Sequence, residues 1–234
     1  MSSVRDLLQR RVGPGIVVRV SRVTWPARLA AELRRRSGRG GVLELFFAFD
    51  DPCSAIALID LSERLSGRRV QLVLRPVLRR GIPDDPALEQ KRRYAIEDAR
   101  RLARRTGLEL ARAEPLGAEQ TRFLAEWVAG APQGPALERF CVAAMRALWL
   151  GGQGPLERGE YEALWRGQLG ASPPPPPSPS PSHRSGTVAA NERLMKRRGP
   201  YDVPAAWIQG RWYFAQDRLA QIAEWLDELG WRTT

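Results

Sequence analysis

The residues best placed to do chemistry lie in two short segments that are far apart in the sequence. Asp51, Cys53 and Ser54 directly follow an apolar run, and Val203 and Pro204 precede another. A carboxylate at the start of a helix either caps the first-turn N–H groups or, when desolvated and protonated, donates a hydrogen bond to a ligand. The same first turn tends to lower the pKa of a thiol, whereas a neighbouring carboxylate raises it.

Asp51 and Cys53 can each be interpreted in two ways. Asp51 is either a plain helix cap or a ligand-binding group, and Cys53 is either a reactive thiol or a small packing residue. The other cysteine, Cys141, lies in an apolar helical pattern and is predicted to belong to the core. The sequence thus directs attention to the chain around position 51.

Apolar patterning predicts the elements that position these residues. Residues 42–49 are almost continuously apolar, as in a central strand covered on both faces. Residues 52–65 carry leucines at helical spacing, and residues 70–76 alternate as a second strand does. We expect this strand–helix–strand unit to form a right-handed crossover between parallel strands.

The rest of the chain is predicted to be mainly helical until a closing hairpin. Helices are expected at about 26–36, 85–106, 117–129, 135–150, 157–167, 187–198 and 216–229, with strands at 204–208 and 211–214 and a short strand-like patch at 16–20. Residues 172–185 contain seven prolines and five serines, which is typical of an extended connector.

Composition excludes several classes of function. Of the net charge of +11, +8 lies in residues 1–40, so the rest of the chain is nearly balanced and nucleic-acid binding is not favoured. Two cysteines and the single histidine, His183, provide neither a disulfide framework nor a metal site, and we expect none. No signal peptide or membrane-spanning run is expected, which predicts a soluble cytoplasmic protein with reduced thiols.

Four segments in order resemble the DsbA-type branch of the thioredoxin-like proteins, especially 2-hydroxychromene-2-carboxylate isomerases and kappa-class glutathione transferases. They are Phe47–Ala55, Arg75–Leu78, the spaced set Lys91, Tyr94, Asp98 and Arg101 with Gly107, and Gly199–Pro204 with Gln216–Leu219. The resemblance implies an α/β thioredoxin-like fold with an inserted α-helical subdomain. Its expected parts are a basic N-terminal extension (1–40), the first part of the thioredoxin-like domain (41–82), the helical insertion (83–171), a Pro/Ser-rich linker (172–186) and the second part (187–234).

The resemblance also implies a site and a ligand. Glutathione would bind as cosubstrate between the helix start, with Asp51, Cys53 and Ser54, and a cis peptide bond at Val203–Pro204. Its γ-glutamyl end would lie at Gln216 and Asp217, although Asp217 is equally explained as a first-turn carboxylate. Lys91 and Asp98 either form a pocket wall or belong to a solvated helix face.

The departures from the family leave three functions open. The family's helix start carries a serine or Cys-x-x-Cys, whereas this chain has Asp51-Pro52-Cys53-Ser54, so two-cysteine exchange is excluded there. The first hypothesis is a glutathione-dependent isomerase or transferase acting on a small organic acid or electrophile, for which the resemblance implies a homodimer. The second is a catalytically lapsed binding module, and the third is a single-cysteine reductase that works through Cys53.

Overall fold

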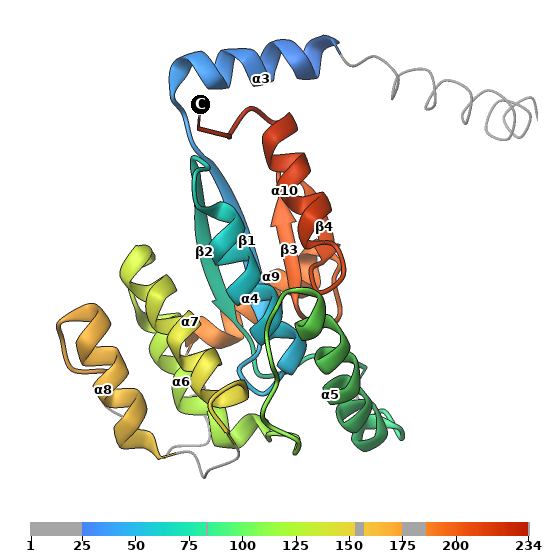
Figure 1. Ribbon diagram of the computed structural model, residues 1–234, viewed down its shortest axis with the longest axis vertical. Helices are drawn as coiled ribbons and strands as arrows, with labels where there is room; N and C mark the ends of the chain where they lie inside the picture. The colour runs from blue at the N-terminus through green and yellow to red at the C-terminus, as the bar shows by residue number, and fades with distance from the viewer. Residues whose placement is uncertain (1–24, 83, 153–156, 175–185, 234) are drawn as a thin grey trace, which may run out of the picture.

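The structure is a computed structural model that describes residues 25–82, 84–152, 157–174 and 186–233 (Figure 1). Its centre is a four-stranded sheet in the order β2-β1-β3-β4. Strand β1 (Gly41–Phe47) is parallel to β2 (Val70–Pro76) and antiparallel to β3 (Ala205–Ile208). Strand β3 continues through a tight turn into β4 (Arg211–Phe214), at the other edge of the sheet.

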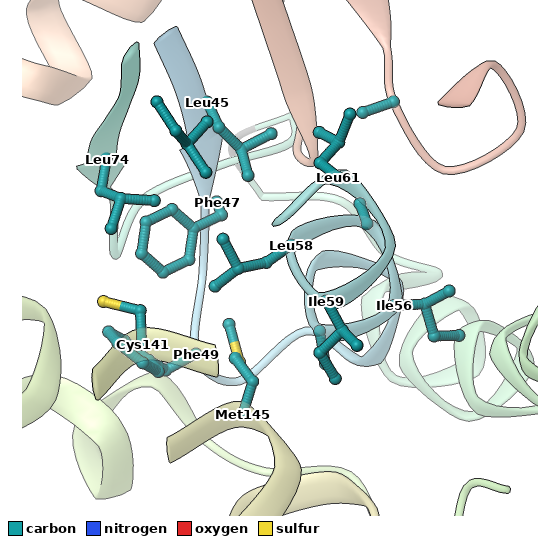
Figure 2. Packing of buried hydrophobic residues seen from close by; sticks show 14 of the residues in the cluster. Leu45, Phe47, Phe49, Ile56, Leu58, Ile59, Leu61, Leu74, Cys141 and Met145 are labelled. Carbon is teal, nitrogen blue, oxygen red and sulfur yellow. The ribbon is translucent and has the colours of Figure 1, made fainter. Parts of the chain in front are cut away.

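The two faces of β1 are buried against different helices, as its continuous apolar sequence predicts. Leu45 and Phe47 face the larger core, where α4 (Pro52–Leu65) contributes Leu58 and α10 (Leu219–Glu228) also packs (Figures 1 and 2). Phe46 faces a smaller core with Met195 of α9 (Gly186–Arg198). Because burying one such Leu or Phe side chain contributes about 1.5–3 kcal/mol, this strand anchors the fold.

A helical subdomain is inserted between β2 and α9. It consists of α5 (Leu88–Arg105), α6 (Ala118–Gly130), α7 (Pro135–Trp149) and α8 (Arg158–Leu169). Helices α5 and α7 pack on α4, α8 packs on α7, and α6 lies against β2 and α9. Cys141 of α7 is fully buried beside Phe49 and Met145, which confirms the prediction that it belongs to the core (Figure 2).

The first described helix, α3 (Trp25–Ser37), packs against the C-terminal end of the chain (Figure 1). Ala31 is 1 % exposed, and its backbone carbonyl lies against Gly230. The Arg34 guanidinium donates a hydrogen bond of 3.1 Å to the Leu229 carbonyl oxygen. Residues 25–37 are therefore part of the packed structure although they come before the first strand of the sheet.

Most predicted elements are present, with differences at their ends. The predicted strand over 42–49 spans 41–47, and the predicted strand over 204–208 begins one residue later because a proline has no N–H for the ladder. The predicted helix over 216–229 begins at Leu219, because residues 216–218 form a turn. The predicted strand-like patch at 16–20 and residues 175–185 of the connector lie outside the described residues. Among the described helices, none is both long and apolar enough to cross a bilayer.

Candidate active site at the end of the sheet

Four chain segments meet at one end of the sheet because of strand pairing. Phe47, the last residue of β1, is paired with Pro76, the last residue of β2. On the other side Phe46 is paired with Ala205, which is paired in turn with Phe214 at the end of β4. The segments that follow β1, β2 and β4 and the segment that precedes β3 therefore lie together. They include the predicted residues at the helix start, at the cis-proline and at the γ-glutamyl-binding turn, whereas Lys91 and Asp98 lie on α5.

Asp51 is the N-cap of α4, with φ −119° and ψ 116°. Its Oδ2 accepts a hydrogen bond of 2.7 Å from the Ser54 backbone N–H and another of 2.6 Å from the Ser54 hydroxyl. The Ser54 hydroxyl oxygen in turn accepts a bond of 3.2 Å from the Ala48 N–H. Ser54 is fully buried, so its predicted ligand-binding hydroxyl is used to connect the end of β1 with the cap of α4.

Burial is the largest influence on the Asp51 carboxyl group and raises its pKa from 3.8 to about 6. The Arg80 charge and the two hydrogen bonds from Ser54 act in the opposite direction, because they stabilise the ionised form. Asp51 is therefore mainly ionised at pH 7, yet it takes up a proton far more readily than an ordinary aspartate. This is the range of pKa in which a carboxyl group accepts and returns protons efficiently near neutral pH.

Cys53 does not have the surroundings of an activated thiol. Its Sγ lies 4.0 Å from the Ala95 carbonyl oxygen of α5, and the residue is partly buried. Burial raises the pKa of the thiol well above its ordinary value, and the charges of Asp51, Asp98 and Asp202 raise it further. These influences outweigh the first turn of α4, so the geometry favours the interpretation of Cys53 as a packing residue.

Arg80, which follows β2, connects two of the meeting segments. Its Nη1 lies 2.6 Å from Oδ1 of Asp50, whose side chain is only 1 % exposed. Its Nε lies 3.9 Å from Oδ1 of Asp202, just before the β3 segment. Burial opposes the charge of the guanidinium, but Asp50 and Asp51 outweigh this and raise the pKa of Arg80. Arg80 therefore remains a cation and joins the start of α4 to the segment before β3.

The loop that carries Arg80 is held from both sides. The Val77 N–H donates to the Phe47 carbonyl oxygen at 2.9 Å. The backbone N–H groups of Leu78 and Arg79 both donate to Oε1 of Glu192 on α9, at 3.1 and 2.9 Å. The position of the guanidinium is thus fixed by β1 and α9 as well as by its ion pair.

The peptide bond between Val203 and Pro204 is cis, as the resemblance predicted. The Val203 side chain lies in the smaller core, and its N–H donates to Oδ1 of Asp202 at 2.9 Å. The Pro204 carbonyl oxygen accepts a bond of 2.8 Å from the Ala215 N–H, in the turn before α10. The backbone around the cis bond is thus connected to the segment that contains Gln216 and Asp217.

The predicted γ-glutamyl-binding turn has one partly buried residue, Gln216, and one exposed residue, Asp217. The Oε1 atom of Gln216 is buried and has no hydrogen-bond partner in the described part of the chain. The Asp217 side chain is 60 % exposed and lies 3.9 Å from Arg218 Nε. The N-cap of α10 is Arg218, which makes no side-chain capping bond, so Asp217 is not the cap of this helix.

The helix face of α5 is mainly a solvated face with charge pairs. Lys91 pairs with Asp85 at 2.5 Å, Arg101 pairs with Asp98 at 3.1 Å, and Tyr94 is largely exposed. A surface hollow of about 530 Å³ lies beside this helix, and another of about 350 Å³ lies between α4 and the residues just after α5. The larger one is lined by Tyr94, but neither includes Asp51 or Val203 in its lining.

Sequence reasoning missed the ionic group formed by Asp50, Arg80 and Asp202. A signal for it exists in the sequence, because Asp50 follows the first predicted strand and Arg80 follows the second. Parallel strands end at the same edge of a sheet, so charged residues just beyond both ends are expected to meet. The contribution of Asp202 depends on the turn before β3 and has no such signal.

Comparison with known proteins agrees with this architecture. No protein-family model matches the sequence. No curated protein matches it either. One similar solved structure is a 2-hydroxychromene-2-carboxylate isomerase, with a TM-score of 0.57 and 15 % identity, over 80 % of this chain and 95 % of that one. Another is a probable DsbA oxidoreductase from Streptomyces coelicolor, with a TM-score of 0.58 and 15 % identity, over 81 % of this chain and 89 % of that one.

At this identity the comparisons show the fold. The sheet order, the cis-proline entry into β3 and the helix that starts after β1 define a thioredoxin-like fold. The two similar structures share this fold over about 80 % of the chain, a span that takes in the inserted helical subdomain. The predicted fold class is thereby confirmed.

Proposed function

We propose that this protein binds glutathione at the end of the sheet where α4 begins and Val203–Pro204 enters β3, and that it acts as a glutathione-dependent isomerase or transferase. The observation that carries the proposal is the meeting of the α4 start, Arg80 and the cis peptide bond at one end of a DsbA-type sheet. One protein of similar structure is an isomerase whose name contains a carboxylate. We therefore extend the proposal to a small organic acid or electrophile as cosubstrate. As a separate proposal, we expect the protein to act in the cytoplasm.

The thiol in this reaction would come from the ligand. Positions 51 and 54 are Asp and Ser, so a two-cysteine exchange cycle has no residues to use there. The raised pKa of Cys53 keeps its thiol protonated at neutral pH, which argues against a single-cysteine reductase. Cys141 is completely buried in α7 and cannot reach a substrate.

Asp51 would act as the proton acceptor for the bound thiol. Its Oδ2 already accepts two hydrogen bonds from Ser54, which leaves Oδ1 for the ligand. The S–H bond of glutathione breaks, the proton passes to the carboxylate of Asp51, and the electron pair stays on sulfur. The positive end of the α4 helix dipole would then stabilise the thiolate, which adds to the cosubstrate or displaces its leaving group together with the bonding electron pair. A pKa of about 6 lets Asp51 give up the proton again at neutral pH.

A second candidate, a lapsed binding module, is favoured by one specific observation. The groups that a peptide-like ligand would use are already engaged within the chain. Asp51 bonds to Ser54, and the Val203 N–H bonds to Asp202. A protein that keeps these contacts when a ligand is offered would retain the fold without the chemistry.

Titration calorimetry with glutathione tests the proposal, followed by a conjugation assay with 1-chloro-2,4-dinitrobenzene. We expect binding heat and glutathione-dependent conjugation by the wild-type protein. Absence of heat at millimolar glutathione would remove the proposal. Binding without conjugation of this or other electrophiles would support the lapsed module.

The variant Asp51→Ser separates the two candidates further. Glu224→Ser, which removes an exposed carboxylate from α10, is the control for the loss of one charge. If Asp51 accepts the proton, Asp51→Ser lowers the conjugation rate by about 10²–10⁴-fold, as for loss of a general base, while Glu224→Ser leaves it unchanged. A gain of activity in Asp51→Ser would instead indicate that Asp51 replaced a functional serine.

A further inference from the structure

One carboxylate oxygen at the end of the sheet interacts with two groups that a ligand would use for binding, a backbone N–H and a guanidinium. Oδ1 of Asp202 accepts the hydrogen bond from the Val203 N–H at 2.9 Å. The same Oδ1 lies 3.9 Å from Nε of Arg80. A backbone N–H next to a cis-proline and a guanidinium together form a receptor for a carboxylate or a peptide carbonyl group.

The interactions of Asp202 with the Val203 N–H and with Arg80 are weak enough for a ligand to displace them. The Asp202 side chain is 44 % exposed, so water competes for its oxygens. The separation of 3.9 Å from Arg80 is longer than a charge-assisted hydrogen bond, which measures about 2.7–2.9 Å. By contrast, Arg80 lies 2.6 Å from Asp50, which is almost fully buried. Arg80 therefore stays in place when Asp202 leaves.

Asp202 also lies within electrostatic reach of the start of α4. Its charge is one of those that raise the pKa of the Cys53 thiol and of the Arg80 guanidinium. A ligand group that binds both the Val203 N–H and Arg80 has to take the place of the Asp202 carboxylate.

We propose that the Asp202 carboxylate is an internal stand-in for an acceptor group of the ligand, and that binding displaces it from the Val203 N–H and from Arg80. This inference rests on the proposed glutathione site and adds the residue that sets its affinity and selectivity. A ligand enters only when it supplies a carboxylate or a peptide carbonyl in exchange. Ligands that have a thiol but no such acceptor leave Asp202 in place and bind poorly.

Two substitutions at the same position separate displacement from a simple charge effect. Asp202→Ala removes the acceptor and the charge, whereas Asp202→Asn removes the charge but keeps an oxygen for the Val203 N–H. If displacement limits binding, Asp202→Ala binds glutathione about tenfold more tightly than the wild type. This factor is the equivalent of one competing hydrogen bond of about 1.4 kcal/mol. Asp202→Asn should gain no more than about threefold.

Calorimetry on the three proteins gives distinguishable outcomes. A larger gain in glutathione affinity for Asp202→Ala than for Asp202→Asn supports the inference. Equal dissociation constants in all three proteins overturn it and leave the proposed function standing. Equal gains in both variants also overturn it, because the loss of charge alone then explains the tighter binding. Absence of binding in all three removes the proposed function and this inference with it.

A measurement on the wild-type protein keeps the inference testable if Asp202→Ala fails to fold. Glutathione should shift the ¹⁵N–¹H resonance of Val203 and the carboxyl ¹³C resonance of Asp202 together, with the same dissociation constant. β-Mercaptoethanol, a thiol without a carboxylate or peptide group, serves as the control ligand and should move neither. Saturation with glutathione while the Asp202 carboxyl resonance stays fixed would overturn the displacement.

Discussion

Replacement of Asp51 by asparagine should stabilise the folded protein at neutral pH. One pKa unit corresponds to about 1.4 kcal/mol, so a rise from 3.8 to about 6 corresponds to about 3 kcal/mol. Between these two values the folded state binds a proton that the unfolded chain does not. The free energy of unfolding contributed by Asp51 therefore falls as the pH rises from about 4 to 6, and it stays low above pH 6.

Asparagine removes this ionisation while it keeps the cap. Asn and Asp are about equally good N-caps, and the amide oxygen can still accept the N–H and hydroxyl bonds of Ser54. We therefore expect Asp51→Asn to raise the free energy of unfolding by about 2–3 kcal/mol at pH 7 and by less than about 0.5 kcal/mol at pH 4. Urea unfolding of both proteins at unit steps of pH measures the difference directly.

Asp217→Asn is the matched control, because that carboxylate is 60 % exposed at the same end of the sheet. It should change the free energy of unfolding by no more than about 0.5 kcal/mol at any pH. A difference between wild type and Asp51→Asn that is independent of pH would refute the reasoning. So would a loss of stability in Asp51→Asn at pH 7, which would mean that the ionised carboxylate is favoured in the folded state.

Three other outcomes follow from the packing. Cys53 should react slowly with iodoacetamide, with a midpoint above the ordinary thiol pKa of 9.0, and a midpoint below it would contradict the burial described above. Arg80→Ala should lower the free energy of unfolding by about 3 kcal/mol, since it leaves a buried carboxylate unpaired, whereas Arg79→Ala at the exposed neighbouring position should cost less than about 0.5 kcal/mol. Equal effects in urea unfolding would remove the ion pair as the cause. Gly230→Ala should lower the thermal midpoint, because φ is +84° and a Cβ would meet a backbone carbonyl of α3, while Gly167→Ala, in open space on α8, should raise it.

The sheet and its helices were predictable because each carries a strong apolar pattern. The strand at 70–76 and the helix at 52–65 have the predicted bounds. The predicted ends of elements were less accurate where a turn interrupts the apolar pattern. Residues 216–218 follow β4 as a turn, so the last helix begins three residues later than its apolar stripe suggests. The parallel pairing of the first two strands follows from the crossover rule and is also present.

The N-terminal helix shows what apolar patterning leaves out. A helix was expected at 26–36, but nothing in its sequence identifies its packing partner. The structure brings Ala31 against Gly230 and places Arg34 5.9 Å from the centre of the Trp231 ring. These contacts join residues about 200 positions apart, and one of them depends on a glycine with positive φ. Only the tertiary arrangement shows why a side chain is excluded there.

At the site, the sequence identified positions but not their hydrogen bonds. It placed Asp51 at a helix start and left its cap role and its ligand role open. The structure makes it a cap whose Oδ2 is engaged with Ser54. No sequence pattern indicates that Asp202 accepts the Val203 N–H, because that bond depends on the turn that leads into β3.

The charges at this end of the sheet decide which form of a thiol can enter. Asp50, Asp51 and Asp202 each raise the pKa of Arg80, so this group of four side chains has an excess of negative charge when all three carboxyls are ionised. A thiolate arriving from water adds another negative charge in a partly buried place, which is unfavourable. A neutral thiol adds none, and transfer of its proton to Asp51 leaves the total unchanged. For this reason we propose that Asp51 is the proton acceptor for a thiol, and not a replacement for the serine at the helix start of the family that the sequence resembles.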